Sequence, residues 1–570
     1  MTSDRKKLRS QQWFAQPNYE SLMNRAATRA EGFTPEVFEN RPVIGICNSW
    51  SELTHCNVHL RTVAEAVKRG VWAAGGFPLE FPTISLGEFY MKPTTMLFRN
   101  LMAMDVEESI RANPLDGVVL LCGCDKTTPA QLMGAASADI PAIMVPGGPM
   151  LNGRWSGGPI GTGTDTRRLY EQFRAGRITD EQLCEIEGCL LRSSGHCNVM
   201  GTASTMTSLA EALGMTLPGC ANIPGPDSRR LAMAEASGRR VVDAVWEDLR
   251  PSRILTRRAF DNAIAADMAL GGSTNAVVHL IAIAGRLGIE LTLQDFDRIS
   301  RRVPFLVNVK PSGQYLMEDF YYAGGLPAVM KEILPILDGE ALTISGRTLA
   351  EDLAGVACHN RDVIRAADNP LYPEGGTVAL TGNLAPDGAV LKQTAASPHL
   401  LQHRGKAYVF ENYRQMCAEI DDDALPVDAS TVLVMKNCGP LGAPGFPEWG
   451  HIPMPRVLLK QNVNDMVRIS DARMSGTSFG TVALHLAPES AVGGPLAVVR
   501  TGDEISLDVP ARRLELCLPA AELERRLAAF EPAPPHYNRG YGKLFLDHVT
   551  QANLGCDFDF LRAVPAAVSD

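Results

Sequence analysis

The fold is decided by the stretch GVVLLCGCDKTTP, residues 117–129. Its first six residues form a continuous apolar run, which is typical of a strand buried on both faces. A polar loop follows, and Pro129 stands where a helix can begin. A helical segment, 130–136, then leads to a second apolar run, 142–146. This strand–helix–strand order predicts an α/β fold with a parallel sheet.

The same arrangement occurs earlier in the chain. An apolar run at 43–47 is followed by a polar loop, 48–57, and by a segment with helical spacing of apolar residues, 58–74. Ligands of parallel sheets bind at the carboxyl ends of strands. Cys124, Asp125 and Lys126 occupy such an end, so we expect a functional site there.

The pattern changes near residue 370, where Asp368-Asn369-Pro370 and Pro373-Glu374-Gly375-Gly376 form a cluster of chain breakers. Short strands and turns dominate beyond it: 377–380, 389–392, 431–435, 466–469, 481–486, 496–499, and a hairpin that includes 505–509. A helix is expected at about 520–530. The sequence therefore predicts an N-terminal α/β domain, 1–370, and a C-terminal β-barrel domain, 371–570.

Composition excludes some classes of function. The 570 residues are 45% hydrophobic and 21% charged, and the net charge of −10 argues against a nucleic-acid surface. No apolar run approaches the about 20 residues that span a bilayer, and the first residues are polar, unlike a secretory signal. We therefore expect a cytoplasmic protein with neither nucleic acid nor membrane as a partner.

Thirteen cysteines are many for such a chain, and no Cys-x-x-Cys pair occurs. An odd number in a reducing compartment argues against a disulfide framework and leaves metal binding open. Cys56, Cys124 and Cys197 lie in polar loops, whereas Cys47 and Cys122 lie in apolar runs. Spacings near 70 residues carry no local metal signature. From the residues alone, a structural thiol is the favoured interpretation of each loop cysteine taken singly.

Carboxylates and one serine share these loop positions. Glu88, Asp125 and Glu448 lie on separate loops, an arrangement that suits Mg²⁺ and also suits ordinary solvated acids. Ser475 lies between Met474 and Gly476 after an apolar run. Its surroundings are not the Gly-x-Ser-x-Gly turn of hydrolases, so it could be a nucleophile, a base or neither.

Several long motifs resemble the dihydroxyacid dehydratase and 6-phosphogluconate dehydratase family. In chain order they are GCDKTTP at 123–129, GHCNVMGTASTM at 195–206, ALGGSTNA at 269–276, the loop 439–448, and DARMSGT at 471–477. The resemblance extends from about residue 40 to the C-terminus. The segment 85–88 and the tail 539–549 are most similar to the sugar-acid (aldonate) dehydratases of that family.

This resemblance implies a set of site residues and a fold of an α/β domain with a β-barrel domain. It implies three ligands of a [2Fe–2S] cluster with one iron left open: Cys56, Cys124 and Cys197. It implies four Mg²⁺ ligands, the lysine as a carbamate: Glu88, Asp125, Lys126 and Glu448. Ser475 would be the base and Thr477 would help to hold the substrate carboxylate. His548 is a further candidate for the substrate pocket.

The implied reaction removes water from a C5 or C6 aldonate to give a 2-keto-3-deoxy acid, in a homodimer or homotetramer. One alternative is the dihydroxyacid dehydratase of branched-chain amino-acid biosynthesis, which acts on 2,3-dihydroxyisovalerate and would need an apolar pocket. A second is a non-catalytic iron–sulfur or zinc sensor, which would have no use for the Mg²⁺ ligands or for Ser475.

Overall fold

Four parallel strands form the centre of the α/β domain in the computed structural model, which describes residues 7–563. They are β1 (Val43–Asn48), β2 (Phe77–Pro82), β3 (Gly117–Cys122) and β4 (Ala142–Pro146), in the order β2-β1-β3-β4. Every residue of β1, β3 and β4 is buried, as expected for a sheet covered on both faces. The predicted parallel sheet is confirmed.

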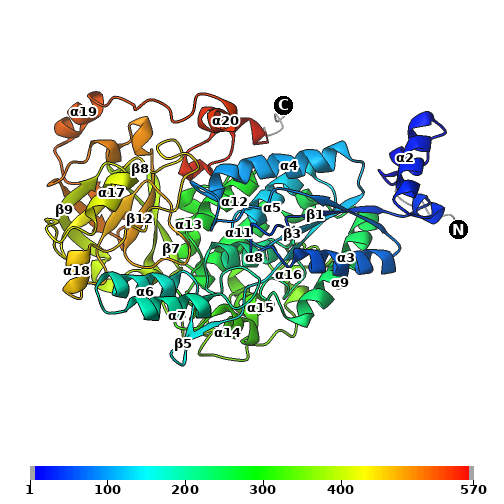
Figure 1. Ribbon diagram of the computed structural model, residues 1–570, viewed down its shortest axis with the longest axis horizontal. Helices are drawn as coiled ribbons and strands as arrows, with labels where there is room; N and C mark the ends of the chain where they lie inside the picture. The colour runs from blue at the N-terminus through cyan, green and yellow to red at the C-terminus, as the bar shows by residue number, and fades with distance from the viewer. Residues whose placement is uncertain (1–6, 564–570) are drawn as a thin grey trace.

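Two pairs of helices cover this sheet, one on each side (Figure 1). One pair is α3 (Leu60–Ala73) with α9 (Ser228–Glu247), and the other is α4 (Arg99–Ala112) with α5 (Thr127–Ala138). The axes of α3 and α9 come close because both carry glycine at the contact. A Cβ on Gly70 would lie 1.9 Å from the carbonyl oxygen of Glu235.

Further helices complete the α/β domain. Two of them, α8 (Thr202–Ala212) and α12 (Asn275–Gly285), are buried along their whole length and form the interior next to α5. The others are α10 (Pro251–Ile254), α11 (Arg257–Leu270), α13 (Leu293–Ser300), α14 (Met317–Tyr322), α15 (Gly325–Glu332) and α16 (Leu349–Asp352).

The C-terminal part forms a closed eight-stranded barrel, as predicted. Its strands are β7 (Thr377–Gly382), β8 (Ala385–Lys392), β9 (Gln402–Phe410), β10 (Val432–Met435), β11 (Arg468–Ser470), β12 (Val482–Ala487), β13 (Glu504–Asp508) and β14 (Arg513–Leu516). The strands β10, β11 and β12 are parallel neighbours. The barrel's interior is a separate apolar cluster.

One predicted strand is wrong. Residues 496–499 lie mostly in a short 3-10 helix, η7 (Pro495–Val498), because Pro495 fixes a helical start and has no N–H for a ladder. The predicted hairpin is confirmed as β13 and β14, and the predicted helix near 520–530 is α19 (Ala520–Ala528).

Two segments tie the domains together. A long connection after β4 carries the hairpin β5 (Gly153–Trp155) and β6 (Gly158–Ile160) and the helices α6 (Thr164–Arg174) and α7 (Asp180–Leu190). Helix α6 lies against α18 (Arg456–Lys460) of the barrel domain, and Arg174 pairs with Asp421, 2.6 Å away. At the other end of the chain, α20 (Gly540–His548) returns to the α/β domain, where the Tyr541 hydroxyl donates to the Leu97 carbonyl at 2.6 Å.

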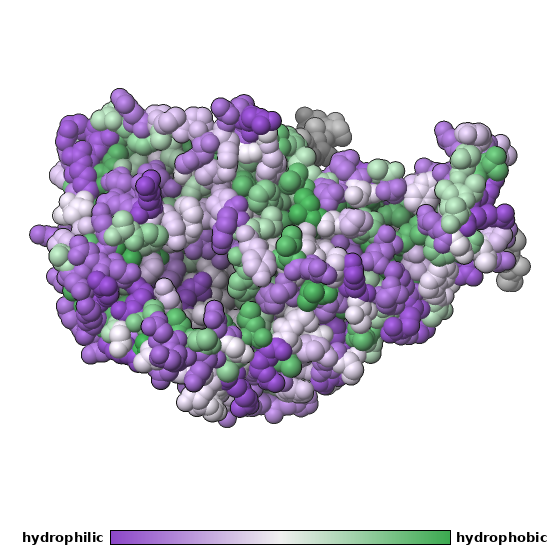
Figure 2. Space-filling view, in the orientation of Figure 1, coloured by the Kyte–Doolittle hydropathy of each residue, from purple (hydrophilic) through white to green (hydrophobic). Residues whose placement is uncertain are grey.

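An N-terminal arm projects from the α/β domain (Figure 1). It consists of α1 (Gln11–Phe14), α2 (Tyr19–Ala30) and η1 (Pro35–Phe38), and hydrophobic side chains reach its surface (Figure 2). Within residues 7–563, no helix combines the length and the apolar character needed to cross a bilayer.

Candidate active site

The loops after strand ends converge on one cavity between the two domains. Those after β1, β2 and β3 carry Cys56, Glu88 and Cys124 to Lys126, and Cys197 lies next to the end of β4 through a bridge between Pro149 and His196. The barrel contributes the loops after its parallel strands β10 and β11, which carry Glu448 and Ser475. Parallel strands thus aim five loops at one place, and the bridge to Pro149 sets the Cys197 loop beside them.

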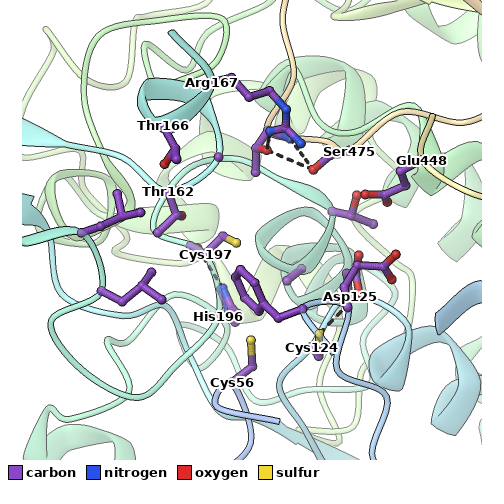
Figure 3. Close-up of a pocket in the computed structure, with 18 residues that line it drawn as sticks. Cys56, Cys124, Asp125, Thr162, Thr166, Arg167, His196, Cys197, Glu448 and Ser475 are labelled. Carbon is purple, nitrogen blue, oxygen red and sulfur yellow. Dashed lines mark hydrogen bonds between the residues drawn. The ribbon is translucent and has the colours of Figure 1, made fainter. Parts of the chain in front are cut away.

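The cavity has a volume of about 350 Å³, within the range typical of small-molecule sites. Eight of the nine residues predicted from the sequence line it: Cys56, Glu88, Cys124, Asp125, Cys197, Glu448, Ser475 and Thr477. Figure 3 shows the three sulfurs on one side of this space, with Asp125, Glu448 and Ser475 facing them. The ninth residue, Lys126, is fully buried behind the carboxylates.

The three thiols form one group. All three are free, and a hydrogen bond between Cys56 and Cys124, together with burial, raises the pKa of the Cys56 thiol well above its ordinary value. Burial raises the pKa of Cys197 to about 11. Thiols kept protonated by desolvation become thiolates when a metal supplies the missing positive charge. Among the described residues, no fourth cysteine lines the cavity.

The carboxylates meet around the ammonium of Lys126. Its Nζ lies 2.6 Å from Asp125 Oδ2, 3.1 Å from Glu448 Oε1 and 3.3 Å from Glu88 Oε2. Burial opposes the charge on Lys126, but the three carboxylates outweigh it and raise the pKa of Lys126 above its ordinary value. Three carboxylates from two domains therefore converge on a single cation.

Other buried groups hold these carboxylates in place. Arg473 Nη1 and Asn275 Nδ2 both donate to Glu448 Oε1, at 3.0 Å each. Burial works against ionisation of Glu448, but Lys126 and Arg473 lower its pKa to about 2. Glu88 accepts from the hydroxyls of Thr94, at 2.8 Å, and Thr95. The carboxylates are thus oriented and, at Glu448, firmly ionised.

Ser475 belongs to a short chain of hydrogen-bonded side chains. Its Oγ is 3.0 Å from the Thr477 hydroxyl, and the guanidinium of Arg167 donates to the same Thr477 hydroxyl (Figure 3). Arg167 belongs to α6 in the connection after β4, and burial lowers the pKa of Arg167 below its ordinary value. A positive charge therefore stands one hydroxyl away from Ser475.

Two helices begin at the cavity: α6 follows Gly163 and α8 starts at Thr202. Two others begin behind its carboxylates: α5 follows Lys126 and α12 starts at Asn275. The turn at Gly476 lies against the start of α8, where a Cβ on Gly476 would come 2.5 Å from the Thr202 nitrogen. Helix N-termini carry partial positive charge and free N–H groups, so this cavity favours an anionic ligand.

Some site residues escaped prediction. Arg167, Thr162 and Thr166 line the cavity but belong to a long connection without a recognisable signature. Arg473 and Asn275 lie inside motifs quoted from the sequence, yet nothing local indicates that both reach Glu448. The expectation for His548 is wrong: its Nδ1 pairs with Asp559, 3.0 Å away, and it does not line the cavity, because α20 directs it elsewhere.

The side chains at the cavity fit the two groups expected from the sequence, an iron–sulfur cluster and Mg²⁺. Among the described residues, no three His, Cys, Asp or Glu side chains are arranged so that they could hold a metal ion. The carboxylates instead surround the Lys126 ammonium, a stand-in cation that marks where positive charge is required. Oxygen donors suit Mg²⁺ and thiols suit an iron–sulfur cluster, so the residues and the groups agree in chemistry.

Known proteins match this chain over most of its length. Residues 41–352 match the model of the dihydroxy-acid/6-phosphogluconate dehydratase N-terminal domain, and residues 362–556 match that of the C-terminal domain. The L-arabinonate dehydratase of Rhizobium leguminosarum bv. trifolii is 54% identical, over 98% of this chain and 96% of the relative.

Two other relatives bear on the substrate. The 6-deoxy-6-sulfo-D-gluconate dehydratase of Pseudomonas putida is 52% identical, again over 98% of this chain and 96% of the relative. The dihydroxy-acid dehydratase of Ignicoccus hospitalis is 40% identical, over 95% of this chain and 98% of the relative. The chain is thus more similar to these sugar-acid enzymes than to this dihydroxy-acid enzyme.

Proposed function

The chain belongs to the dihydroxy-acid/6-phosphogluconate dehydratase family, and from this premise we propose that it dehydrates a C5 or C6 sugar acid to the 2-keto-3-deoxy acid. The observation that carries the proposal is the convergence of three thiols, three carboxylates and Ser475 on one cavity. The higher identity to the relatives named L-arabinonate dehydratase and 6-deoxy-6-sulfo-D-gluconate dehydratase supports the substrate class.

Cys56, Cys124 and Cys197 would hold a [2Fe–2S] cluster, and Glu88, Asp125, Glu448 and carbamylated Lys126 would hold Mg²⁺. When bound, these groups would supply Lewis acidity toward the departing hydroxyl and toward charge that develops near the carboxylate. Three cysteines, one fewer than a fully protein-ligated cluster uses, support an open position for substrate. The convergence of three carboxylates on Lys126 supports the second site.

Ser475 is the proposed base that takes the proton from C2. A serine acts as a base only when positive charge stabilises its alkoxide, and Ser475 has two such sources within the protein. One is Arg167, connected through the Thr477 hydroxyl, and the other is the N-terminus of α8. The C2–H electrons form the C2–C3 double bond as the C3–O bond breaks, the hydroxyl leaves with its electron pair, and the proton taken from C2 balances it, so that water is the second product.

Thr477 and Arg167 would bind the anionic and hydroxyl groups of the substrate beside the base. The enol that remains after loss of water loses its C2 hydroxyl proton and gains a proton at C3, which gives the 2-keto-3-deoxy acid. The cavity wall carries hydroxyls, from Thr162 and Thr166, as well as apolar side chains, from Phe89 and Leu190. The choice of a sugar acid over 2,3-dihydroxyisovalerate therefore rests on the relatives and not on the wall.

A substrate panel tests the proposal. The protein, purified without oxygen and supplied with Mg²⁺, is assayed for 2-keto acid with C4 to C6 aldonates, 6-deoxy-6-sulfogluconate and 2,3-dihydroxyisovalerate. We expect at least one C5 or C6 aldonate to exceed 2,3-dihydroxyisovalerate at least tenfold in kcat/KM, about 1.4 kcal/mol of transition-state binding. Preference for 2,3-dihydroxyisovalerate, or no turnover with cluster present, would refute it.

A further inference from the structure

Two charged side chains are buried where the two domains join. Asp267 belongs to α11 of the α/β domain, and Lys392 is the last residue of β8 in the barrel. Each is 1% exposed. Among the described residues, neither carboxylate oxygen of Asp267 nor the Nζ of Lys392 has a hydrogen-bond partner. A buried charge is costly unless another group compensates it, and the proposed chemistry uses neither residue.

The two charges compensate each other. The Gly376 N–H donates to the Met268 carbonyl at 2.9 Å, one residue beyond Asp267. The next residue, Thr377, pairs with Lys392 across strands β7 and β8. Burial raises the pKa of Asp267 to about 7 and lowers the pKa of Lys392 to about 7, and each is the sole charged group among the described residues that offsets this effect in the other. They form one charge pair between the domains.

The carboxylate of Asp267 packs against a tight turn that follows α11. A Cβ on Gly272 would lie 1.9 Å from Asp267 Oδ1, so a larger residue would displace the carboxylate. The Gly272 N–H also donates to the Asp267 carbonyl at 3.0 Å. On the barrel side, a Cβ on Gly376 would lie 2.5 Å from the Gly271 Cα. The turn is thus held between the carboxylate and the linker that leads to the barrel.

The same turn carries the side chain that orients two parts of the active site. Asn275 Nδ2 donates to Glu448 Oε1 at 3.0 Å and to the Met474 carbonyl at 3.1 Å. Ser475 follows directly after that carbonyl. Within the turn, the Ser273 hydroxyl accepts the Asn275 N–H at 3.2 Å. A shift of the turn would therefore move both a proposed Mg²⁺ ligand and the backbone next to the proposed base.

We propose that Asp267 and Lys392 form a positioning pair for the reaction. The pair fixes the turn 271–275, and the turn then orients Glu448 and the backbone before Ser475. Neither member of the pair lines the cavity, so both act through the turn. This inference rests on the proposed function, because it gives the pair a role in that chemistry.

The first test removes the negative charge of the pair. Asp267→Asn keeps the shape of the side chain, and Asp503→Asn is the matched control. Asp503 is 10% exposed, pairs with Arg526 at 2.6 Å, and lies in the barrel domain outside the cavity. Both variants should have a lower unfolding temperature, since each leaves a buried cation without its partner.

The two variants should differ at the site. We expect Asp267→Asn alone to raise the Kd for Mg²⁺ at least fivefold by calorimetry and to lower kcat at least tenfold, with KM changed less than threefold. Its amides 271–275 should also exchange hydrogen faster than in the control. An Asp267→Asn protein that is destabilised like Asp503→Asn, yet keeps wild-type Mg²⁺ affinity, kcat and exchange, would overturn the proposal.

The second test addresses the pairing. Lys392→Met removes the ammonium and keeps the length of the side chain, so it should reproduce the losses by leaving the carboxylate without a counter-charge. The double variant D267N/K392M should recover part of the Mg²⁺ affinity and of the slow exchange relative to Lys392→Met, because no uncompensated charge remains. A double variant that binds Mg²⁺ no better than Lys392→Met would overturn the pair, and this comparison does not need a folded Asp267→Asn protein.

Failure of this inference can be told apart from failure of the proposed function, because Mg²⁺ affinity and amide exchange require no substrate. A wild type that turns over none of the acids, but shows the expected differences from Asp267→Asn in both measurements, would refute the dehydratase proposal alone. A wild type that is active on a sugar acid, with Asp267→Asn matching Asp503→Asn in kcat, Mg²⁺ affinity and exchange, would refute the positioning pair alone.

Discussion

Ser475 is the residue on which the proposed chemistry depends most. Replacing it with alanine removes the hydroxyl that would take the C2 proton but leaves the thiols, the carboxylates and Lys126 in place. We expect Ser475→Ala to lower kcat by roughly 10²–10⁴-fold. The visible absorption of the proposed cluster should be unchanged, since Ser475 lies on the side of the cavity opposite the sulfurs (Figure 3).

The matched control for this variant is Ser478→Ala, which removes a buried hydroxyl three residues away that does not line the cavity. Ser478→Ala should keep most of the activity. Wild-type turnover in Ser475→Ala would remove Ser475 from the role of base. Loss of the cluster spectrum in that variant would mean that the serine supports the cluster instead.

Glu489 makes stability depend on pH. Burial, and repulsion from Asp471, raise the pKa of its carboxyl from an ordinary value of 4.5 to about 7. Between these two pH values the folded protein binds a proton that the unfolded chain has lost, so this group's contribution to stability is present below pH 4.5 and is lost as pH rises toward 7.

Replacing Glu489 with glutamine should remove this dependence, because an amide does not ionise and can still accept from the Leu441 and Gly442 N–H groups that Glu489 now binds. Unfolding temperature is measured from pH 5 to pH 8 for both proteins. The difference, Glu489→Gln minus wild type, should increase as pH rises. A difference that stays constant or decreases would contradict the shifted pKa.

At the scale of elements, the start of α6 is shaped to receive Thr477. Gly163 precedes the helix with φ +72°, and a Cβ there would lie 2.1 Å from the Thr477 Oγ1. Gly176, just beyond the end of α6, has φ +74° and no atom within 4 Å of a Cβ position. Both glycines have a positive φ, but they differ in what a methyl group would meet.

Gly163→Ala should therefore lower kcat/KM by tenfold or more, because it displaces Thr477 and with it the contact to Arg167. Gly176→Ala carries the backbone cost of positive φ, about 1 kcal/mol, without touching the cavity. Its kcat/KM should stay near wild type while its unfolding temperature falls. Equal losses of activity in the two variants would show that α6 acts through stability alone.

The elements best predicted from the sequence are those whose burial dictates their composition. Strands β1, β3 and β4 are apolar throughout because helices cover both faces of the sheet, so their bounds are visible in the chain. Strand β9 escaped prediction because its sequence, QHRGKAYVF, mixes charges with apolar residues on a half-exposed barrel surface. Residues 496–499 have strand-forming side chains, and only Pro495 indicates the turn that they adopt.

For the site, the sequence predicted individual residues but not the contacts between distant ones. Cysteines and carboxylates next to strand ends could be identified one by one, and the family resemblance is confirmed by the comparisons. The contact between Arg167 and Thr477 joins residues 310 positions apart, and Asn275 reaches Glu448 across 173 positions. Contacts of that separation arise from domain packing, which no local pattern encodes.

At the scale of the molecule, the carboxylates that surround Lys126 come from both domains. Glu88 and Asp125 belong to the α/β domain and Glu448 to the barrel domain. A cation held by all three would link the domains, and a ligand at 100 times its Kd stabilises the folded state by about 2.7 kcal/mol. We expect Mg²⁺ to raise the unfolding temperature of wild type but to have little effect on Glu448→Gln.

The unfolding temperature of protein treated with a chelator provides the baseline for this comparison. The control is Glu411→Gln, which changes an exposed acid of the barrel domain. Glu411→Gln should respond to Mg²⁺ as wild type does. An Mg²⁺ response that persists in full in Glu448→Gln would place the cation elsewhere.

In the proposed reaction, a sugar acid bound in this cavity loses its C2 proton and its C3 hydroxyl. Proton NMR of the reaction in D₂O tests it directly, with an accepted pentonate or hexonate as substrate. We expect a 2-keto-3-deoxy acid with one deuterium at C3, because the proton that C3 gains during tautomerisation comes from solvent. A product without deuterium at C3, or one that has lost a hydroxyl from another carbon, would contradict it.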